Sequence, residues 1–373
     1  MEDGHNYSNW IEVDLGAIEN NVRLIHQHTG VQVMAVVKAN AYGHGAIPIA
    51  RAAIQGGAAW FGVARIEEAL EIRKGGLDSP VLVLGFTSPG RLEEAIANRI
   101  SLAVWDKDQV ERISAVAASI GKPAQLHLKV DTGMNRLGIQ PLDALALARL
   151  IESKVNVIFE GVFTHFARAD EADPGPSMIQ EILFIQTVAD LAAAGIHPPL
   201  IHAANSAASM TRPNSRFNLV RAGIALYGLH PSKDCQLTSE FRPALSWKSV
   251  LTQVKLLPPG RGVSYGHEYT TGAYEHIGTV PVGYADGFRR QPGNQVLIAG
   301  RKVPVVGRVC MDQITIQIDG APNAKEGDEV VIIGSQEKSR ITAEEVGYRW
   351  GTVNYEVVCG IGHRVPRLYI RTN

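Results

Sequence analysis

The sequence predicts an α/β protein in which an N-terminal (β/α)8 TIM barrel is followed by a C-terminal all-β domain. With 373 residues, the chain is longer than one ordinary hydrophobic core requires. Eight apolar, β-branched runs alternate with helix-like segments between residues 33 and 228, and short strands crowd the chain from about residue 244. We therefore expect the barrel within residues 1–240 and the β-domain within residues 241–373.

The eight runs that predict the barrel are mainly apolar and do not alternate with polar residues, which is typical of parallel strands buried on both faces. They span residues 33–38, 59–64, 81–86, 101–105, 124–130, 159–165, 200–206 and 218–228. The segments between them look helical: residues 47–57 close on glycine, and residues 177–196 carry helical apolar spacing. Eight strand–helix units in roughly 200 residues fit a (β/α)8 barrel. A doubly wound sheet is the alternative, but no G-x-G-x-x-G turn follows any of these runs.

The second domain is predicted from a change in the sequence pattern, from alternating strands and helices to closely spaced short strands. Runs such as LSWKSV, HIGTVPV, QVLIAG, KVPVV, ITIQI and DEVVIIG are separated by Gly, Pro and Asp turns, with few helical stretches. One further strand, WIEVDL at residues 10–15, precedes the barrel. We expect residues 1–15 to pair with the β-domain, which would bring the two ends of the chain together.

The composition of the chain excludes some classes of binding partner and indicates the cellular compartment. Hydrophobic residues make up 45% and charged residues 20%, the mix of a soluble globular protein. The net charge is −1 without a basic stripe, so nucleic acid is not an expected partner. No run of 18 apolar residues occurs, so a membrane is not an expected partner either. The polar opening and the lack of 18 consecutive apolar residues predict a cytoplasmic protein. Three widely spaced cysteines predict neither a disulfide framework nor a metal site.

Polar residues gather where the predicted barrel strands end, which is where the chemistry of such barrels lies. Five of the eight strands contribute: they end on or near Lys38, Lys129 with Asp131, His165, Asn205 with Ser206, and Arg221 with Gly223. An amine that loses hydration at an apolar barrel mouth favours its neutral, nucleophilic form, which can form a Schiff base. A serine at a helix start and glycine amides are groups that hold phosphate. Together these residues suggest pyridoxal 5'-phosphate (PLP).

Each of these residues also has a purely structural interpretation. Lys38 could be a rim lysine that extends its amine to water, and His165 could be a histidine satisfied by its neighbours. Arg221 could bind a carboxylate on the next helix, and Lys129 could pair with Asp131. The structural interpretations must also explain why all of these residues fall at the same end of their strands.

Nine segments, in this order along the chain, resemble the bacterial alanine racemases. They are AVVKANAYGHG, DTGMNRLG, THFARAD, HAANSAAS, NLVRAGIALYG, VSYG, VPVGYADG, GRVCMDQ and NYEVVCGIGHRVPR. The resemblance runs from about residue 10 to RVPR near the C-terminus. It implies a homodimer with shared active sites, in which each subunit is a PLP-binding barrel followed by a β-domain. It also implies the interconversion of L- and D-alanine, supplying D-alanine for cell-wall peptidoglycan.

The resemblance also assigns roles to individual residues. Lys38 matches the lysine that binds PLP covalently, and Arg221 matches the arginine that faces the pyridine nitrogen. The remaining residues of the implied cofactor-binding set are Tyr42, His165, Asn205, Ser206, Gly223, Ile224 and Tyr355.

Other positions match the substrate side of the family's site. Arg136 matches an arginine near the cofactor's phenolic oxygen and the substrate carboxylate, and Lys129 matches a lysine that carries a carbamate in many relatives. Tyr265 matches a second catalytic base supplied by the other subunit, where Met311 and Tyr284 match substrate-side positions. The chain departs from the family pattern at Asn135, where glycine is common.

Three other functions compete with alanine racemisation. A PLP-dependent decarboxylase shares this architecture, but it would place an acidic residue where Arg221 stands. A single-barrel PLP-binding protein would end after the barrel, and a Schiff-base aldolase would not need a phosphate cradle. Among racemases, serine or other small amino acids compete with alanine, since substrates that differ by one small group are separated by only about 1–3 kcal/mol.

Overall fold

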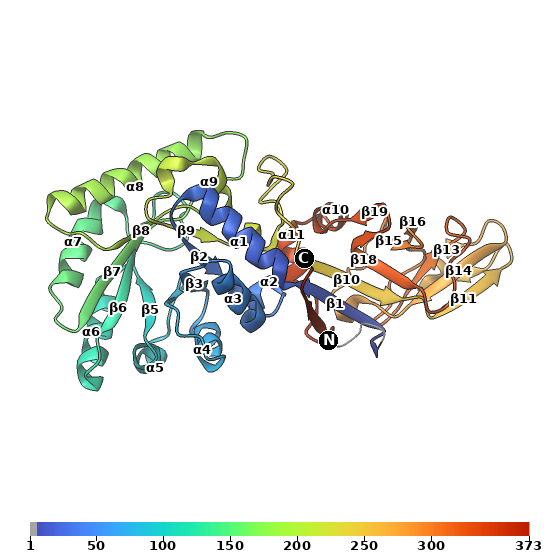
Figure 1. Ribbon diagram of the computed structural model, residues 1–373, viewed down its shortest axis with the longest axis horizontal. Coiled ribbons are helices and arrows are strands. Elements are labelled where there is room, and N and C mark those ends of the chain that lie inside the picture. The colour runs from blue at the N-terminus through green and yellow to red at the C-terminus, as the bar shows by residue number, and fades with distance from the viewer. Residues whose placement is uncertain (1–5, 373) are drawn as a thin grey trace. The chain divides into compact units, whose positions relative to one another are not determined.

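The computed structural model describes residues 6–372 and divides into two compact units. The barrel unit comprises Ala17–Ala41 and Gly45–Arg242. The β unit comprises the chain up to Gly16, the short segment Tyr42–His44, and the chain from Pro243 onward. Figure 1 shows the parallel strands of the barrel unit with helices around them, and the long strands of the β unit.

Eight parallel strands form the barrel unit, so the predicted fold class is confirmed. They are β2 (Gln32–Val36), β3 (Trp60–Val63), β4 (Val81–Val83), β5 (Ile100–Val104), β6 (Ala124–Lys129), β7 (Val157–Phe163), β8 (Leu200–His202) and β9 (Leu219–Ala222), in the order β8-β7-β6-β5-β4-β3-β2-β9. The two ends of this order meet through backbone hydrogen bonds from Asn218 to Ile201 (3.4 Å) and from Arg221 to Ala204 (2.9 Å). These bonds nearly close the barrel.

Helices connect the barrel strands. They are α1 (Leu15–Thr29), α2 (Lys38–Tyr42), α3 (Ala46–Gln55), α4 (Ile66–Lys74), α5 (Leu92–Ala97), α6 (Lys107–Ile120), α7 (Pro141–Glu152), α8 (Gly175–Ala193) and α9 (Ser206–Thr211). Local sequence explains individual boundaries: the Asp106 carboxylate caps α6 by accepting from the backbone N–H of Gln109. In residues 6–372, no helix combines the length and apolar character needed to cross a bilayer.

The barrel strands are shorter than their apolar runs suggested. Strand β2 ends at Val36, β8 at His202 and β9 at Ala222, whereas the sequence predicted strands to residues 38, 206 and 228. Apolar composition continues past each strand because the following loops are also buried. The predicted site residues Lys38, Ser206 and Gly223 therefore lie in the segments that follow the strands.

The β unit contains a sheet in the order β16-β15-β18-β10-β1-β20, with β19 on β18, a three-stranded sheet β11-β14-β17, and the pair β12-β13. Strand β1 (Asn9–Asp14) runs antiparallel to β10 (Leu245–Val250) and parallel to β20 (Arg367–Ile370). The first described strand thus lies between strands from the C-terminal third of the chain.

The remaining elements of this unit are short. The strands are β11 (Gln253–Leu257), β12 (Gly262–Val263), β13 (Tyr269–Thr270), β14 (Glu275–Val280), β15 (Gln295–Ile298), β16 (Arg301–Pro304), β17 (Ile314–Gln317), β18 (Glu329–Gln336) and β19 (Ser339–Ile341). Two helices that the sequence did not predict, α10 (Ala343–Arg349) and α11 (Asn354–Cys359), follow β19.

Candidate active site

Lys38 begins a left-handed turn. Residues Ala39, Asn40 and Ala41 all have φ between 52° and 53° and ψ between 49° and 54°, a conformation that costs about 1 kcal/mol or more for each non-glycine residue. Side chains stabilise it: Glu68 Oε1 accepts from the backbone N–H of Ala39 at 2.6 Å, and Asn40 Oδ1 accepts from that of Ala46 at 2.8 Å. The lysine is half-buried at the start of this strained turn.

Glu68 was not predicted from the sequence, although it orders the loop that follows Lys38. Besides Ala39, its carboxylate accepts from the backbone N–H of Ala64 at 2.7 Å and of Arg65 at 3.2 Å. It therefore joins the loop after β2 to the loop after β3. The available signal was its position in the first turn of the helix that follows β3, where an acidic side chain can cap backbone N–H groups.

The Arg221 guanidinium is buried on β9 and is bound by backbone carbonyls and histidines rather than by a carboxylate. Nη2 donates to Thr164 O at 2.7 Å and to Ala203 O at 2.9 Å. Nη1 donates to Nδ1 of His202 at 2.8 Å and to the carbonyl oxygen of the same residue at 3.0 Å. Burial lowers the pKa of Arg221 to about 9. The interpretation of Arg221 as a salt-bridge partner for the next helix is thus wrong.

His165 lies among the cations of the barrel unit. Its Nδ1 is 3.2 Å from Nη2 of Arg221. Burial lowers the pKa of His165 well below its usual value, and the charges of Arg221, Lys129, Arg136 and Lys38 lower it further, in that order. The imidazole is therefore neutral at physiological pH. The charges of these four predicted residues thus all act on one histidine.

Lys129, the last residue of β6, is a buried amine whose Nζ lies 4.5 Å from the centroid of the Phe163 ring. Burial lowers its pKa to about 7; Arg221 and Arg136 add to the effect, and Asp131 opposes it. About half of this amine is therefore uncharged near neutral pH.

The loop between Lys129 and Arg136 is organised by Asp131. One oxygen of this carboxylate accepts from the backbone N–H groups of Gly133 and Asn135, both at 3.0 Å. Asn135 adopts a φ of 53°, a left-handed conformation that asparagine tolerates better than most residues. The departure from glycine at this position therefore preserves the turn that leads into Arg136.

Ser206, Gly223 and Ile224 form one small cluster in the barrel unit. The Ser206 hydroxyl accepts from the backbone N–H of Gly223 at 2.9 Å and from that of Ala225 at 3.3 Å, which leaves its own hydrogen to donate. Asn205 caps helix α9, because its side chain accepts from Ala208 N at 3.0 Å. The cluster has the backbone and hydroxyl character of a phosphate cradle.

Two further predicted residues, Tyr42 and Tyr355, belong to the β unit. Their rings are in contact, and the ring centroids lie 6.2 Å apart. Burial raises the pKa of Tyr42 well above its usual value, so its hydroxyl stays protonated and remains a donor. Gly43 follows at a φ of +83°, and a Cβ there would collide with the carbonyl oxygen of Val358. The segment 42–44 is further bound by Arg367, whose Nε donates to Gly43 O at 3.1 Å.

The other predicted residues of the β unit are exposed. Tyr265 and Met311 line an open hollow of about 620 Å³ together with Cys310. Their exposed fractions are 70% for Tyr265 and 53% for Met311, and Tyr284 is 47% exposed. Backbone hydrogen bonds from Tyr284 to Cys310 O and from Ala285 to Met311 O, both 3.0 Å, join the two segments.

The structure thus brings Lys38, Lys129, Arg136, His165 and Arg221 together in the barrel unit. Sequence reasoning missed Glu68, and it missed two buried histidines, His127 and His202, on β6 and β8.

Two family models cover most of the chain. The model described as "Alanine racemase, N-terminal domain" matches residues 13–231, and "Alanine racemase, C-terminal domain" matches residues 244–369. The chain belongs to the alanine racemase family. An alanine racemase of Symbiobacterium thermophilum is 45% identical over 363 residues, which cover 96% of each chain. One of Geobacillus kaustophilus is 43% identical over 368 residues, covering 97% of this chain and 94% of the relative.

Solved structures of the alanine racemase family have the same fold. The alanine racemase of Clostridium difficile 630 matches with a TM-score of 0.94 at 39% identity, covering 98% of this chain and 97% of that one. The Bacillus anthracis alanine racemase with bound L-Ala-P matches with a TM-score of 0.92 at 39% identity, covering 98% of this chain and 95% of that one.

Proposed function

We propose that this member of the alanine racemase family interconverts L-alanine and D-alanine. The observation that carries the proposal is the convergence of Lys38, Lys129, Arg136 and Arg221 around His165 at the carboxyl ends of the barrel strands. Such a concentration of cations in one partly buried region suits an anionic cofactor and a substrate carboxylate. Membership of the family over nearly the whole chain supports the reaction type.

The cofactor of the proposed reaction is PLP, and the donor set of the barrel unit fits it. Lys38 supplies the amine, and the Ser206 hydroxyl, which accepts from the Gly223 N–H, keeps its own hydrogen to donate to a phosphate. The resemblance adds the backbone at Gly223 and Ile224 to the phosphate-binding set. The resemblance adds Tyr42 and Tyr355 as phosphate donors, and Asn205 and His165 as further cofactor contacts. Bound PLP withdraws electrons from the α-carbon of an amino acid.

Arg221 has a distinct role in this proposal. A guanidinium is a donor without acceptor capacity, so one that faces the pyridine nitrogen leaves that nitrogen unprotonated. The electron withdrawal is then weaker than with an acidic residue at the same position, which disfavours side reactions such as transamination. An arginine here also argues against the decarboxylase alternative.

Lys38 and Tyr265 are the proposed bases. Inversion at the α-carbon requires one group to remove a proton from one face and another group to return a proton to the opposite face. We assign the two faces to the Lys38 amine and to the phenol of Tyr265 from a partner subunit, in a homodimer with shared sites. The exposure of Tyr265 and Met311 supports this role, because side chains that serve another subunit lie on the surface of their own.

Substrate binding is assigned to Arg136, Met311 and Tyr284. Arg136 binds the substrate carboxylate, and Met311 with Tyr284 limits the space around the side chain. Lys129 is proposed to carry a carbamate that orients Arg136. Its lowered pKa supports this modification, because carbon dioxide reacts with the neutral amine.

The proposed cellular setting is the cytoplasm, where the product D-alanine would enter cell-wall peptidoglycan. Within residues 6–372, no disulfide joins Cys235, Cys310 or Cys359, which agrees with a reducing compartment.

A chiral assay tests the proposal. Purified protein with PLP and L-alanine should approach equal amounts of the two enantiomers, and Tyr265→Ala should nearly abolish conversion from L-alanine. Tyr274→Ala is the matched control, since Tyr274 is a tyrosine of the same unit with 68% exposure. Full activity of Tyr265→Ala in both directions would remove the two-base scheme.

The same assay separates the alternatives. Faster inversion of L-serine than of L-alanine would make serine the substrate. Release of carbon dioxide without D-amino acid would identify a decarboxylase instead.

A further inference from the structure

A line of hydrogen-bonded side chains starts at Arg221 and crosses the interior of the barrel unit. Nη1 of Arg221 lies 2.8 Å from Nδ1 of His202, whose Nε2 lies 2.9 Å from Nδ1 of His127. Nε2 of His127 lies 3.1 Å from Oε2 of Glu160, which also accepts from the Ser101 hydroxyl at 2.5 Å. The five residues come from five different strands, β9, β8, β6, β7 and β5.

The two imidazoles in this line are held by packing. His127 and His202 are fully buried. The ring of Phe163 stacks on His202 with centroids 4.8 Å apart and an interplanar angle of 5°, and the edge of Trp60 meets His127 at 5.6 Å. Gly161 leaves room for the His127 ring, because a Cβ at that position would collide with it. The line therefore has little freedom to rearrange.

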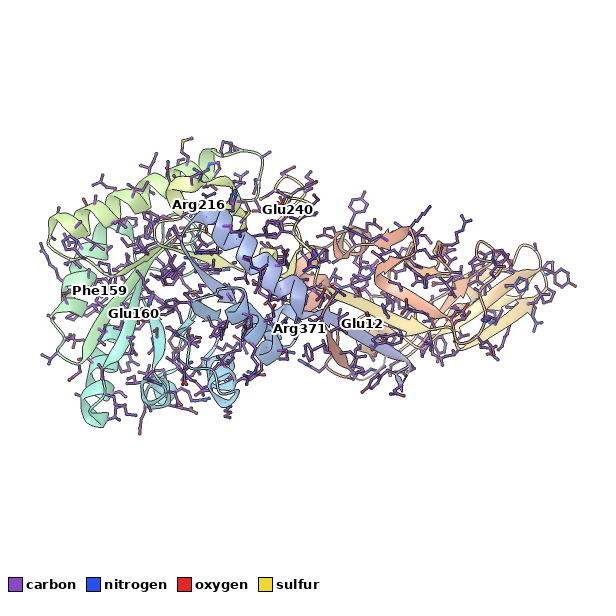
Figure 2. All side chains as sticks on the ribbon, viewed as in Figure 1. Glu12, Phe159, Glu160, Arg216, Glu240 and Arg371 are labelled. Carbon is purple, nitrogen blue, oxygen red and sulfur yellow. The ribbon has the colours of Figure 1, made fainter. Side chains whose placement is uncertain are left out.

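Glu160 ends the line where it reaches solvent. It lies on β7 next to Phe159, as Figure 2 shows, and its side chain is 21% exposed. The carboxylate is thus partly hydrated and close enough to accept from the buried His127 ring.

The direction of every hydrogen bond in the line follows from the chemistry of its ends. A guanidinium only donates, so Nδ1 of His202 must be an unprotonated acceptor. Burial lowers the pKa of both His202 and His127, so each ring is neutral and carries one hydrogen. His202 therefore donates from Nε2 to His127, and His127 donates from Nε2 to the Glu160 carboxylate.

The line also determines what Arg221 can offer elsewhere. Both Nη1 hydrogens are bound by His202, and Nη2 donates to Thr164 O and Ala203 O. Among the hydrogen bonds of residues 6–372, Nε of Arg221 makes none. Its N–H is the donor that remains for a bound ligand.

We propose that Glu160 is a remote positioning residue for Arg221. Its carboxylate is the final acceptor that keeps His127 and His202 in their Nε2–H forms, and these rings hold Nη1 of Arg221 so that Nε–H is left for the cofactor. The existence of the line stands on geometry alone, whereas its effect on the reaction rests on the function proposed above. Without an acceptor at position 160, a buried N–H of His127 would be unsatisfied, and the line would loosen as far as Arg221.

Nuclear magnetic resonance of the protein with ¹⁵N-labelled histidine and arginine tests the line directly. In the holoenzyme, long-range ¹H–¹⁵N spectra should show protonated Nε2 and unprotonated Nδ1 on both His127 and His202. Glu160→Met removes the acceptor and should shift the His127 nitrogens toward mixed tautomers and broaden the Arg221 Nε–H signal. Glu160→Gln keeps an acceptor oxygen and should retain the wild-type pattern.

The second readout is the ratio of transamination to racemisation. Glu160→Met should raise this ratio roughly tenfold, because a loosened Arg221 controls the pyridine nitrogen less well. Glu160→Gln, which keeps an acceptor oxygen, should have a ratio close to that of the wild type. Glu152→Met is the matched control, since Glu152 is an exposed carboxylate of the same unit outside the line.

The outcomes separate this inference from the proposed function. A proton on Nδ1 of either ring in the wild type would overturn the inference, even if Glu160→Met does not fold. Unchanged spectra, or an unchanged product ratio, in a folded Glu160→Met protein would overturn it as well. An enzyme without racemase activity would refute the proposed function, while the spectra would still decide whether the line exists.

Discussion

The two units hold their candidate residues in opposite ways. In the barrel unit, Arg221 and Lys129 are buried. Arg221 is fixed by hydrogen bonds to His202 and Thr164, and Lys129 lies over the Phe163 ring. In the β unit, Tyr265 and Met311 project from the surface with more than half of their area exposed. The contrast teaches that the barrel residues are positioned by their own fold, whereas the fold of the β unit leaves Tyr265 and Met311 largely uncovered. On the proposal above, a partner subunit supplies their surroundings.

The largest expected effect is the loss of racemase activity when Lys38 of the barrel unit is replaced. Lys38→Ala should abolish detectable racemisation, a loss of at least about 10⁴-fold, because it removes both the proposed cofactor link and one base. Borohydride treatment should fix the cofactor to the wild-type peptide that contains Lys38, and mass spectrometry should find no such adduct in the variant. Lys74→Ala, which changes an exposed lysine of the same unit, is the control. An adduct on a lysine other than Lys38 in the wild type would contradict the assignment of the cofactor link to this lysine of the barrel unit.

A second prediction concerns stability in the β unit. Gly43→Ala should lower the free energy of unfolding by about 2 kcal/mol more than Gly260→Ala. Both glycines have φ near +80°, but a Cβ at Gly43 meets a carbonyl oxygen, whereas a Cβ at Gly260 meets nothing within 4 Å. Urea denaturation measures the difference. Equal losses in the two variants would show that segment 42–44 is not held tightly.

A third prediction uses the pKa of Lys129. The unfolded amine keeps its proton up to about pH 10.5, whereas burial lowers the folded pKa to about 7. Between these values the unfolded state binds more protons, so the contribution of Lys129 to stability rises with pH by up to about 1.4 kcal/mol per unit. Lys129→Met should lack this rise when carbon dioxide is excluded. The difference between the two unfolding curves from pH 7 to pH 10 measures it.

A carbamate on Lys129 sharpens that prediction. Labelled bicarbonate at pH 8 should give a carbamate ¹³C signal in the wild type that is missing in Lys129→Met. Because the modified nitrogen no longer titrates as an amine, the pH dependence of stability should flatten. A wild-type protein without this signal would contradict the assignment.

The smallest expected effect is the change in protein stability caused by replacing the exposed Tyr265. Tyr265→Ala should change the free energy of unfolding by no more than about 0.5 kcal/mol, because its side chain is 70% exposed. A large loss of stability would mean that the activity of this variant reports folding rather than chemistry, and circular dichroism during thermal unfolding decides between them.

The sequence predicted the barrel well because buried parallel strands can be recognised in the sequence as continuous apolar runs. The strand ends also predicted that Lys38, Lys129 and Arg221 lie close enough to His165 to influence it, since the ends of parallel strands share one rim. The strand ends were placed too late, because buried loops after β8 and β9 have the same composition as strands.

What the sequence could not give is the set of contacts between distant strands. The left-handed turn after Lys38 depends on Glu68, and the line from Arg221 to Glu160 needs residues up to 94 positions apart along the chain. No local pattern records such contacts, because they form only when the barrel closes.

On this proposal, one active site combines the barrel unit of one subunit with the Tyr265 region of another, and mixed dimers test this arrangement most directly. Lys38→Ala and Tyr265→Ala proteins, each inactive alone, would be unfolded and refolded together. If the site is shared, half of the dimers contain both chains and one of their two sites is intact, so activity should return to about a quarter of the wild-type value. If mixing restores no activity although mixed dimers form, Tyr265 acts within its own chain and the account is wrong.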